Sequence, residues 1–554
     1  MLRITNLRLP LNHDPQALAR AVRQRLGLKD AQQLLSTTIF RRAYDARKKA
    51  AIELIYTLDC ELKDPATEAR LLASNDSDLR PSPDTRYRLI ASAPIDFALT
   101  HPRPVVVGFG PCGLFAALVL AQMGLKPLVL ERGRAVRQRT KDTWGLWRQG
   151  VLDPASNVQF GEGGAGTFSD GKLWSQISDP RHLTRKVLQE FVKAGAPEEI
   201  LYVSKPHIGT FRLVSMIEKM RAEIESLGGE IRFEQQLVDL HIEAGAVRGL
   251  RLASGEQIDA THVVLALGHS ARDTFEMLHA RGVQMQAKPF SVGFRIEHPQ
   301  SLIDAARFGP NAGHPILGAA DYKLVHNASN GRSVYSFCMC PGGTVVAATS
   351  EPERVVTNGM SQYSRAERNA NAGIVVGISP QDYRQDGRHE GTVSPLDGMA
   401  FQRRWESRAY ELGGGGYRAP AALVGDFLKR QTSTVLGEIE PSYKPGVTLT
   451  QLAAPGQEVL PAYVLDAIRE ALPRFAGQIR GFDRPDAVLT GVETRTSSPL
   501  RVPRGRDFQS LNVRGLFPAG EGAGYAGGIM SAGVDGIEVA EALARSLLQL
   551  DSGE

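Results

Sequence analysis

Cysteine is scarce in this sequence: Cys60, Cys112, Cys338 and Cys340 are the only four in 554 residues. So few cysteines exclude a scaffold held together by disulfides and favour a reducing compartment, so we expect a cytoplasmic protein. An excess of charge of one sign is also lacking, because 65 basic and 60 acidic residues leave a formal net charge of +5. For a chain of this length, that charge does not by itself indicate nucleic-acid binding.

An uninterrupted hydrophobic segment is missing as well. In residues 105–130 the only charge is Lys126, and the segment is long enough to span a bilayer. Four glycines and two prolines interrupt it. Their spacing predicts a strand, a turn, a helix and a second strand buried in protein, so we expect no membrane span. Residues 1–11 contain two arginines but no apolar block, and they do not predict a signal peptide.

Residues 1–100 are expected to form a separate α+β unit of the ferredoxin-like type. Asp14 and Pro15 are typical of a helix start, and Gly27 can end that helix. Apolar residues recur at every second position of residues 52–62, which predicts a strand with one buried face. The expected order is strand, helix, strand, strand, helix, strand, at residues 2–9, 14–27, 35–41, 52–62, 66–73 and 87–91. Five prolines in residues 75–104 predict a linker.

From Pro104 onward, short apolar strands and helical patterns predict an α/β fold. Residues 275–485 are less regular and rich in β-like segments. The chain is expected to finish with a short strand, a glycine-rich turn and a long helix to Leu550. The clearest elements outside the irregular part are expected at residues 105–107, 114–121, 127–130, 211–227, 231–268 and 515–517.

The segment Gly108-Phe-Gly-Pro-Cys-Gly113 follows an apolar strand and opens an apolar helix. This G-x-G-x-x-G pattern is typical of a dinucleotide-binding turn, in which Gly110 lets the backbone approach a pyrophosphate and Gly113 lets helix and strand pack closely. Glu131 ends the next strand, at about the sequence separation from the glycine turn that is expected of an acid that binds ribose hydroxyls. A carboxylate there disfavours a 2′-phosphate, so FAD or NAD fits better than NADP. The alternative is a glycine turn without a ligand.

Two further glycine-rich segments point to a flavin. Residues 157–172 (NVQFGEGGAGTFSDGK) contain five glycines, and they form either a loop against a flat ring and phosphates or a surface loop. Residues 516–536 (LFPAGEGAGYAGGIMSAGVDG) carry a strand into a helix. This turn would place Glu521 on a ribityl hydroxyl and aim a helix N-terminus at the flavin pyrimidine edge. Residues 263–270 read as a buried strand ending at Gly268.

The chain resembles the bacterial flavoproteins known as FAD-dependent or NAD(FAD)-utilising dehydrogenases, within the glutathione-reductase-like class. The resemblance covers nearly the whole chain. It implies a bound FAD, a redox activity, and a Rossmann-like FAD-binding domain in two parts, residues 101–275 and 486–554. A β-rich substrate domain (276–485) would be inserted between them and the ferredoxin-like unit (1–100) would precede them. The motifs are GFGPCG, FGEGGAGTFSDGK, SVGFRIEHP (291–299), FCMCPGG (337–343), GVETRTSSP (491–499) and GEGAGYAGGIMSAGVDG.

The residues expected to contact FAD belong to these motifs and to neighbouring strands. They are Gly108, Phe109, Gly110, Pro111, Cys112, Gly113, Glu131, Arg132, Gly163, Gly164, Ala165, Gly166, Thr167, Val238, Gly268, Gly520, Glu521, Gly527, Gly528 and Ile529. No metal is expected, because no second C-x-C or histidine pair supplies four ligands.

The catalytic candidates are two pairs of residues. Cys338-Met-Cys340 is the only closely spaced cysteine pair, and it forms either a disulfide beside the flavin or two small buried thiols in a strand. Arg495 could clamp a substrate carboxylate with Glu493 as proton acceptor, or both could serve in structural ion pairs. The chain lacks the C-x-x-C disulfide and the second dinucleotide fold of glutathione reductase. NADH or NADPH would therefore visit the flavin transiently, or an organic substrate would supply the electrons.

Two weaker signals remain. His207 and His269 lie near glycine turns and are either bases or hydrogen-bonded structural residues. Residues 41–49 hold five basic side chains against one acid, Asp45. They either contact RNA or form a solvated loop face.

We therefore predict an FAD-dependent oxidoreductase, a dehydrogenase or reductase, in which the flavin exchanges a hydride with a small organic substrate or a nicotinamide. Two alternatives remain open. One is a flavin-dependent RNA-modifying enzyme that holds RNA with the N-terminal unit. The other is a protein that binds FAD without turnover.

Overall fold

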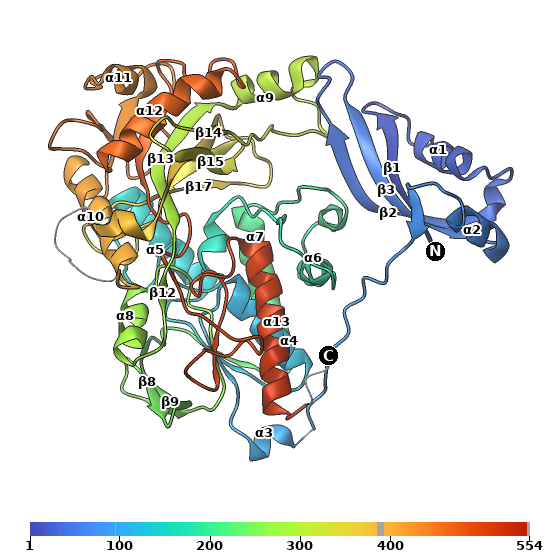
Figure 1. Cartoon of the computed structure of the whole chain (residues 1–554), viewed down its shortest axis with the longest axis horizontal. Coiled ribbons are helices and arrows are strands. Elements are labelled where there is room, and N and C mark those ends of the chain that lie inside the picture. Colours follow the sequence, from blue (N-terminus) through green and yellow to red (C-terminus); the bar gives the residue numbers. More distant parts are fainter. Residues whose placement is uncertain (95, 385–392, 551–554) are drawn as a thin grey trace.

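The structure is a computed structural model that describes residues 1–94, 96–384 and 393–550. Figure 1 shows a small sheet at one side, near the N-terminus, joined by an extended segment to the rest of the molecule. The remainder has two parts, a parallel sheet covered by the helices α4 (Pro111–Gln122) and α13 (Ile529–Leu547) and a larger, mostly antiparallel sheet above it.

The N-terminal unit has the β-α-β-β-α-β order of a ferredoxin-like fold. Its antiparallel sheet has the order β2-β3-β1-β4. Alternate residues of β3 are buried, as its apolar spacing predicts. The elements are β1 (Leu2–Pro10), α1 (Ala17–Leu26), β2 (Leu34–Asp45), β3 (Glu53–Leu62), α2 (Pro65–Leu72) and β4 (Leu79–Pro81).

Two expectations for this unit were wrong in position. The fourth strand is β4 and not residues 87–91, because Leu79 pairs with Ile4 on the free edge of β1 and residues 87–91 form no strand. Helix α1 begins at Ala17, because Asp14 caps a turn before it by accepting a hydrogen bond from the Gln16 N–H. Gly27 does end this helix, in the left-handed conformation at φ 63°.

A five-stranded parallel sheet forms the centre of the α/β part. Its order is β23-β11-β5-β6-β7, with bounds β5 (Val105–Val107), β6 (Leu128–Leu130), β7 (Glu230–Arg232), β11 (Val263–Leu265) and β23 (Leu516–Pro518). The hydrophobic segment 105–130 is therefore β5, α4 and β6, buried in protein as predicted. Among the described residues, no helix is both long and apolar enough to cross a membrane.

Helix α13 packs directly on α4 through glycine. A Cβ atom on Gly536 would lie 2.2 Å from the carbonyl oxygen of Cys112, so only glycine permits this approach. Helix α7 (Thr210–Ser226) also contacts α4. Helices α5 (Val136–Gln149) and α6 (Leu183–Lys193) were not predicted, since polar side chains such as Arg139 and Lys186 lie among their core-facing residues. Next to the parallel sheet are α8 (Arg272–Ala280) and a small antiparallel sheet of β8 (Leu237–Glu243), β9 (Ala246–Leu252) and β10 (Gln257–Asp259).

The larger sheet has seven strands in the order β14-β15-β18-β13-β21-β19-β20. Its central strands β13 (Phe290–Pro299) and β18 (Asn369–Ile378) are buried along nearly their whole length. Strands buried on both faces show no alternation, which explains why the sequence pattern looks irregular here. The others are β14 (Val325–Asn327), β15 (Ser333–Cys340), β19 (Ala419–Leu423), β20 (Val447–Leu449) and β21 (Val488–Glu493).

Helices and short ribbons complete this part of the molecule. Figure 1 shows α9, α11 and α12 along the outer side of the sheet and α10 at its end. The helices are α9 (Gln300–Phe308), α10 (Asp397–Leu412), α11 (Val424–Lys429) and α12 (Ala462–Ala476), and the ribbons are β12 (Gln286–Ala287) with β22 (Leu500–Arg501) and β16 (Gly343–Ala347) with β17 (Thr357–Ser361).

Candidate functional site

A cavity of about 390 Å³ lies where the carboxyl ends of β5, β6 and β11 meet the seven-stranded sheet. The carboxyl ends of parallel strands are where ligands of such folds bind. The cavity wall brings together segments far apart in the chain: 107–112, 130–132, 159–175, 266–271, 337–338, 493–496 and 520–532.

Glycines build one wall of this cavity. Gly108 has φ 98°, and a Cβ atom there would lie 2.3 Å from the Ala266 carbonyl oxygen. A Cβ on Gly113 would lie 1.9 Å from the Gly108 carbonyl oxygen, so Gly113 packs helix against turn and does not line the cavity. Gly110 faces Gly164 of the 157–172 loop, with only 3.6 Å between the Cβ position and the Gly164 Cα. The predicted turn and the predicted loop therefore meet backbone to backbone.

Two helix N-termini open on the cavity. The N-cap residues are Gly110 for α4 and Gly528 for α13, and neither supplies a side-chain hydrogen bond to its helix. The first-turn N–H groups of a helix have no partner within the helix. Both ends line the cavity, and their free donors and positive dipole ends favour anionic groups.

The Glu131 carboxylate accepts hydrogen bonds from three backbone N–H groups, in addition to its predicted role at a ribose. Its Oε2 accepts from the Phe109 N–H at 2.8 Å, and its Oε1 accepts from the N–H groups of Gly133 and Gly161 at 2.9 Å. The side chain thus ties the glycine turn to the 157–172 loop, and lone-pair capacity remains on Oε2 for one ribose hydroxyl. Its neighbour Arg132 binds Asp273 and lies over the Phe160 ring, 4.3 Å from the ring centroid.

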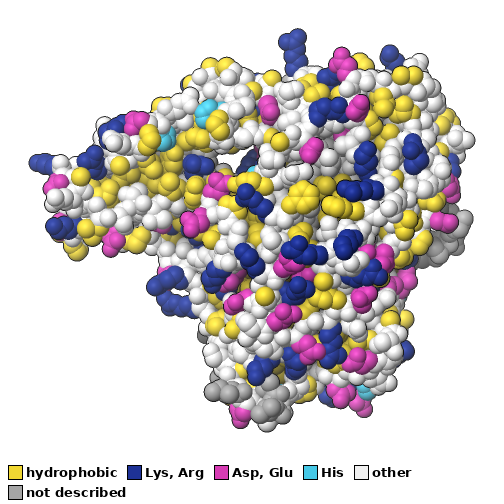
Figure 2. All heavy atoms as spheres, turned by 180° about the vertical axis from the view of Figure 1, so that it is seen from behind, with side chains coloured by type: hydrophobic (Ala, Val, Ile, Leu, Met, Phe, Trp, Pro, Cys, Tyr) yellow, Lys and Arg dark blue, Asp and Glu magenta, His cyan; other side chains and the backbone are white. Residues whose placement is uncertain are grey.

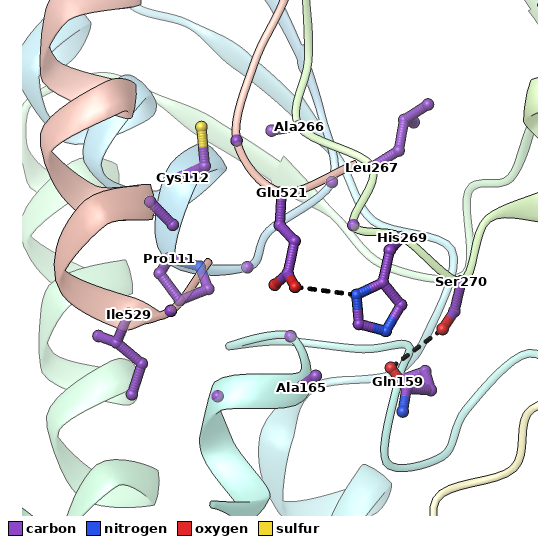
Figure 3. Close-up of a pocket in the computed structure, with 18 of the residues that line it drawn as sticks. Pro111, Cys112, Gln159, Ala165, Ala266, Leu267, His269, Ser270, Glu521 and Ile529 are labelled. Atoms are coloured by element: carbon purple, nitrogen blue, oxygen red, sulfur yellow. Dashed lines mark hydrogen bonds and ion pairs between the residues drawn. The ribbon is translucent and has the colours of Figure 1, made fainter. Parts of the chain in front are cut away.

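Glu521 and His269 point toward each other in the cavity (Figure 3). The Glu521 Oε1 lies 3.1 Å from the His269 Nδ1. Neither ring nitrogen of His269 has hydrogen-bond geometry with a described residue, although both are buried. Behind them the Ser270 hydroxyl donates to Gln159 at 3.1 Å. The buried Nε2 of His269 has no partner among the described residues, which points to a polar ligand in this cavity.

The seven-stranded sheet contributes the opposite wall. Cys338 of β15 and Glu493 of β21 line the cavity from this sheet, and Asn358 lines it from β17 of the neighbouring β16–β17 ribbon. Glu493 is paired with Arg295, whose Nε donates to its Oε2 at 2.7 Å. Burial raises the pKa of Glu493, and the Arg295 charge acts in the opposite direction. Lys172 also lines this region and donates to the carbonyl oxygen of Met339.

The guanidinium of Arg495 binds other side chains of the protein, which disfavours the predicted clamp on a substrate carboxylate. Although it lines the cavity, its Nε and Nη2 bind Glu406 at 3.0 and 2.9 Å, and its Nη1 donates to Ser270 and Ser350. Glu406 is fully buried and also binds Arg272. Both predicted residues are therefore in ion pairs with distant partners, not with each other.

The remaining predicted residues fall into two groups. Val238 does not line the cavity and its neighbour Leu237 does, because successive residues of β8 face opposite ways. Gly163, Thr167 and Cys340 are also outside the lining. The predicted residues that do line it are Gly108, Phe109, Gly110, Pro111, Cys112, Glu131, Arg132, Gly164, Ala165, Gly166, Gly268, Gly520, Glu521, Gly527, Gly528, Ile529, Cys338, Glu493 and Arg495.

Several lining residues were not among the predicted site residues. Gln159 and Lys172 belong to the 157–172 segment, so its motif carried a signal for them. Asn358 and Trp174 lie outside every motif, and nothing local in the sequence marks them. His207 is away from the cavity lining and its Nε2 lies 2.9 Å from the Tyr363 carbonyl oxygen, as the structural alternative expected.

The described residues contain no group of histidine, cysteine or carboxylate side chains that could hold a metal ion. In residues 41–49, Arg47 binds Asp45, and the backbone of Arg42 pairs with Tyr202 and Ser204 of the body. Figure 2 shows basic and acidic side chains interspersed over the back of the molecule, and an opening between the N-terminal unit and the body. RNA contact by residues 41–49 stays a prediction.

Comparisons with known proteins point to a flavin. Residues 289–496 match a family described as FAD-dependent protein, C-terminal domain-like, and residues 1–61 match a domain of unknown function. An uncharacterized protein of Clostridium beijerinckii is 47% identical over 542 residues, which are 98% of each chain. A dual trans-enoyl reductase/FAD-dependent monooxygenase of Aspergillus terreus is 29% identical over 192 residues, 33% of this chain and 25% of that one.

The solved structures that match are remote. The flavin-dependent brominase Bmp2 has a TM-score of 0.35 at 12% identity and covers 82% of this chain and 81% of its own. Glycine oxidase from Geobacillus kaustophilus has a TM-score of 0.34 at 12% identity, with 80% and 94% covered. These values are too low to say anything of the reaction.

FAD is the cofactor of this protein. The matched family is FAD-dependent, and the cavity fits the molecule on its own evidence. It has a glycine wall without Cβ atoms, two helix N-termini without side-chain caps and, among the described residues, a buried imidazole nitrogen without a partner, the His269 Nε2.

Proposed function

The chain belongs to the family of its full-length Clostridium beijerinckii relative, and from this premise we propose that it is an FAD-dependent oxidoreductase. The bound FAD would supply hydride exchange at its N5 with a small organic substrate or with NADH or NADPH. FAD supplies the two-electron chemistry when bound, and the protein supplies position and electrostatics.

One observation carries this proposal: a single cavity joins the nucleotide-binding turn to reactive side chains of another sheet. Gly110 and the α4 N-terminus lie on one side, and Cys338 and Glu493 line the other. A protein that only stored FAD would need only the side formed by Gly110 and the α4 N-terminus. A thiol and a carboxyl group facing the same space supply groups that can act on a substrate.

Different residues of the cavity would contact different parts of FAD. The α4 N-terminus would hold the pyrophosphate, and Glu131 would hold a ribose hydroxyl. Glu521 would bind the ribityl chain, and the α13 N-terminus would face the flavin pyrimidine edge. Each residue named lines the cavity.

Glu493 is the residue that would hold and move a proton at the substrate. It is 3% exposed, and burial raises its pKa above that of an ordinary glutamate although the Arg295 charge acts in the opposite direction. A buried carboxyl group at the cavity can serve as a general acid or base. Arg295 fixes its orientation through two hydrogen bonds. Arg495 binds the cavity-lining Ser270 and the buried Glu406, and is a positioning residue.

The domain division follows from the same proposal. The FAD-binding domain comprises residues 101–275 and 486–554, in the glutathione-reductase-like arrangement, and residues 276–485 form the substrate domain. The parallel sheet supports this division, because β23 from the second part pairs with β11 from the first. We also propose a cytoplasmic location, on the low cysteine content.

Anaerobic stopped-flow absorbance tests the proposed function. The holoenzyme is mixed with NADH, with NADPH and with a panel of small organic acids, alcohols and amines. We expect at least one of them to bleach the flavin band in a single turnover, and Glu493→Gln to slow that step with an organic substrate while FAD stays bound. A flavin that dithionite reduces but none of these compounds does would favour the alternative, FAD binding without turnover.

A further inference from the structure

The Cys338-Met339-Cys340 segment departs from regular strand geometry at the cavity wall. Phe337 pairs with Gly373 of β18 and Cys340 with Asn371, so two residues of β15 stand opposite one residue of β18. This is a β-bulge, a feature that re-aims a side chain and is common next to active sites. Cys338 has φ 41°, in the left-handed region that is rare for residues other than glycine.

The bulge brings the two thiols together. In a regular strand, residues i and i+2 are about 6.6 Å apart along the chain, close to the upper limit for a disulfide. Here the Cys340 Sγ donates to the Cys338 carbonyl oxygen at 3.3 Å, so the second thiol folds back against the first residue. Both cysteines are free. Gly359 of β17 leaves the space for Cys340, since a Cβ there would lie 3.0 Å from its sulfur.

The two sulfurs differ in access. Cys338 is partly exposed and lines the cavity, whereas Cys340 is fully buried behind it. A sulfur that meets a substrate must be accessible, while a resolving sulfur needs to reach only its partner. The arrangement assigns the first role to Cys338 and the second to Cys340.

Two cations hold this segment in place. Arg295 donates to the Cys338 carbonyl oxygen at 2.9 Å, and the Lys172 ammonium donates to the Met339 carbonyl oxygen. The hydrogen bond from Cys340, followed by the Lys172 and Arg295 charges, lowers the pKa of the Cys338 thiol against the effect of burial. The thiolate is the nucleophilic form of cysteine.

The other two cysteines lack these properties. Cys60 lies in the N-terminal sheet, and burial raises its pKa to about 11. Burial also raises the pKa of Cys112 well above that of an ordinary thiol. Neither thiol is described with a cysteine partner, so only the 338–340 pair combines a reactive thiol with a second one in reach.

We propose that Cys338 and Cys340 form a redox-active dithiol that exchanges two electrons with the bound flavin and reduces the disulfide of a small thiol compound. This inference rests on the proposed function and names its substrate class. The flavin supplies the electron pair, which it takes from the nicotinamide.

The steps balance at the sulfur atoms. The Cys338 thiolate attacks the substrate disulfide, whose S–S bond breaks, and one thiol leaves with a proton from solvent. Cys340 gives up its proton and attacks Cys338, so the second thiol leaves and a Cys338–Cys340 disulfide forms. Two electrons from the reduced flavin and two protons then restore the dithiol.

An electron count tests this proposal without any turnover. The holoenzyme is oxidised with diamide, freed of the reagent and titrated anaerobically with dithionite. We expect an uptake of four electrons per chain, two for the flavin and two for the disulfide. Cys338→Ser and Cys340→Ser are each expected to take up two. The matched control Cys60→Ala is expected to take up four, because its thiol lies in the N-terminal sheet.

Peptide mass spectrometry gives a second readout on the unmodified chain. The tryptic peptide 333–354 contains both cysteines and no other. After oxidation it should resist alkylation, and after the full titration it should take two alkyl groups.

An uptake of two electrons by wild-type holoenzyme, with both cysteines of this peptide open to alkylation before reduction, would overturn the dithiol. That result leaves the proposed function intact, because the flavin is still reduced. The proposed function fails separately, when no nicotinamide or organic compound reduces the flavin, whatever the electron count.

Discussion

At the residue scale, Gly110 lies at the proposed pyrophosphate site. It caps α4, lines the cavity, and its Cβ position faces Gly164 at 3.6 Å. Valine would bring a branched side chain into the space where a pyrophosphate meets the helix N-terminus.

We therefore expect Gly110→Val to weaken FAD binding at least about a hundredfold, or ~2.7 kcal/mol, measured as flavin content and by fluorescence titration. Gly377→Val is the control, because Gly377 lies in β18 with nothing within 4 Å of its Cβ position. A yellow, fully loaded Gly110→Val protein would contradict the placement of the cofactor.

Glu406 carries the clearest electrostatic prediction. Although burial disfavours its charge, Arg272 and Arg495 outweigh that effect and lower its pKa well below the ordinary value. A carboxyl group with a lowered folded-state pKa contributes stability above its unfolded-state pKa of about 4.3, and loses it as pH falls through the folded value.

Glu406→Gln should lower the free energy of unfolding by about 3–5 kcal/mol at pH 7, because two buried guanidinium groups lose their counter-charge. Urea denaturation at pH 7 and below pH 4 measures the effect, and the gap between wild type and variant should narrow at the lower pH. A gap that widens in acid would show that Glu406 is not the charged partner.

At the residue scale, the sequence allowed the prediction of contacts within one local motif. The roles of Gly108 and Gly113 follow from steric needs of one turn, and the structure shows both contacts. The ion partners of Glu493 and Arg495 could not be predicted, because Arg295 and Glu406 are 198 and 89 residues away in the chain.

The α4–α13 contact is the element-scale feature that shapes the cavity. Gly536 allows the two helices to touch, and both helix N-termini line the site. In Gly536→Ala, the added methyl group would collide with the Cys112 carbonyl oxygen and push α13 away from α4.

We expect Gly536→Ala to cost about 1–3 kcal/mol of stability and to weaken FAD binding, measured by thermal unfolding and flavin release. Gly145→Ala, in α5 with its nearest atom at an ordinary 3.7 Å, should be neutral or slightly stabilising. Equal stability and equal flavin release in the two variants would contradict the packing role of Gly536.

Element positions were predictable where one face of an element is buried. Strand β3 alternates and was found in place, while β13 is buried on both sides and gave no periodic signal. The bulge at Cys338 depends on its pairing with β18, a strand about 30 residues later, so sequence spacing suggested two thiols on one regular strand face.

At the scale of the whole molecule, the N-terminal unit contacts the body mainly through β2 and the loops beside it. Arg42 extends a backbone bridge to the 202–204 segment, His314 lies 2.7 Å from Asn12, and Tyr44 packs on Phe308. The cavity contains no residue of this unit, so its stability and cofactor binding should be separable.

Leu58→Ala tests this separation, because Leu58 is fully buried in the N-terminal sheet. We expect a loss of about 2–5 kcal/mol in that unit, seen as an earlier far-UV transition on heating, with the temperature of flavin release unchanged. Flavin release that moves together with the early transition would show one cooperative unit instead.

An experimental structure of the FAD-bound protein tests the central claim most directly. We expect the pyrophosphate at the α4 N-terminus and the flavin ring between the α13 N-terminus and the wall formed by Cys338 and Glu493. A flavin ring turned away from these side chains, or FAD bound outside this cavity, would contradict the proposed reaction site.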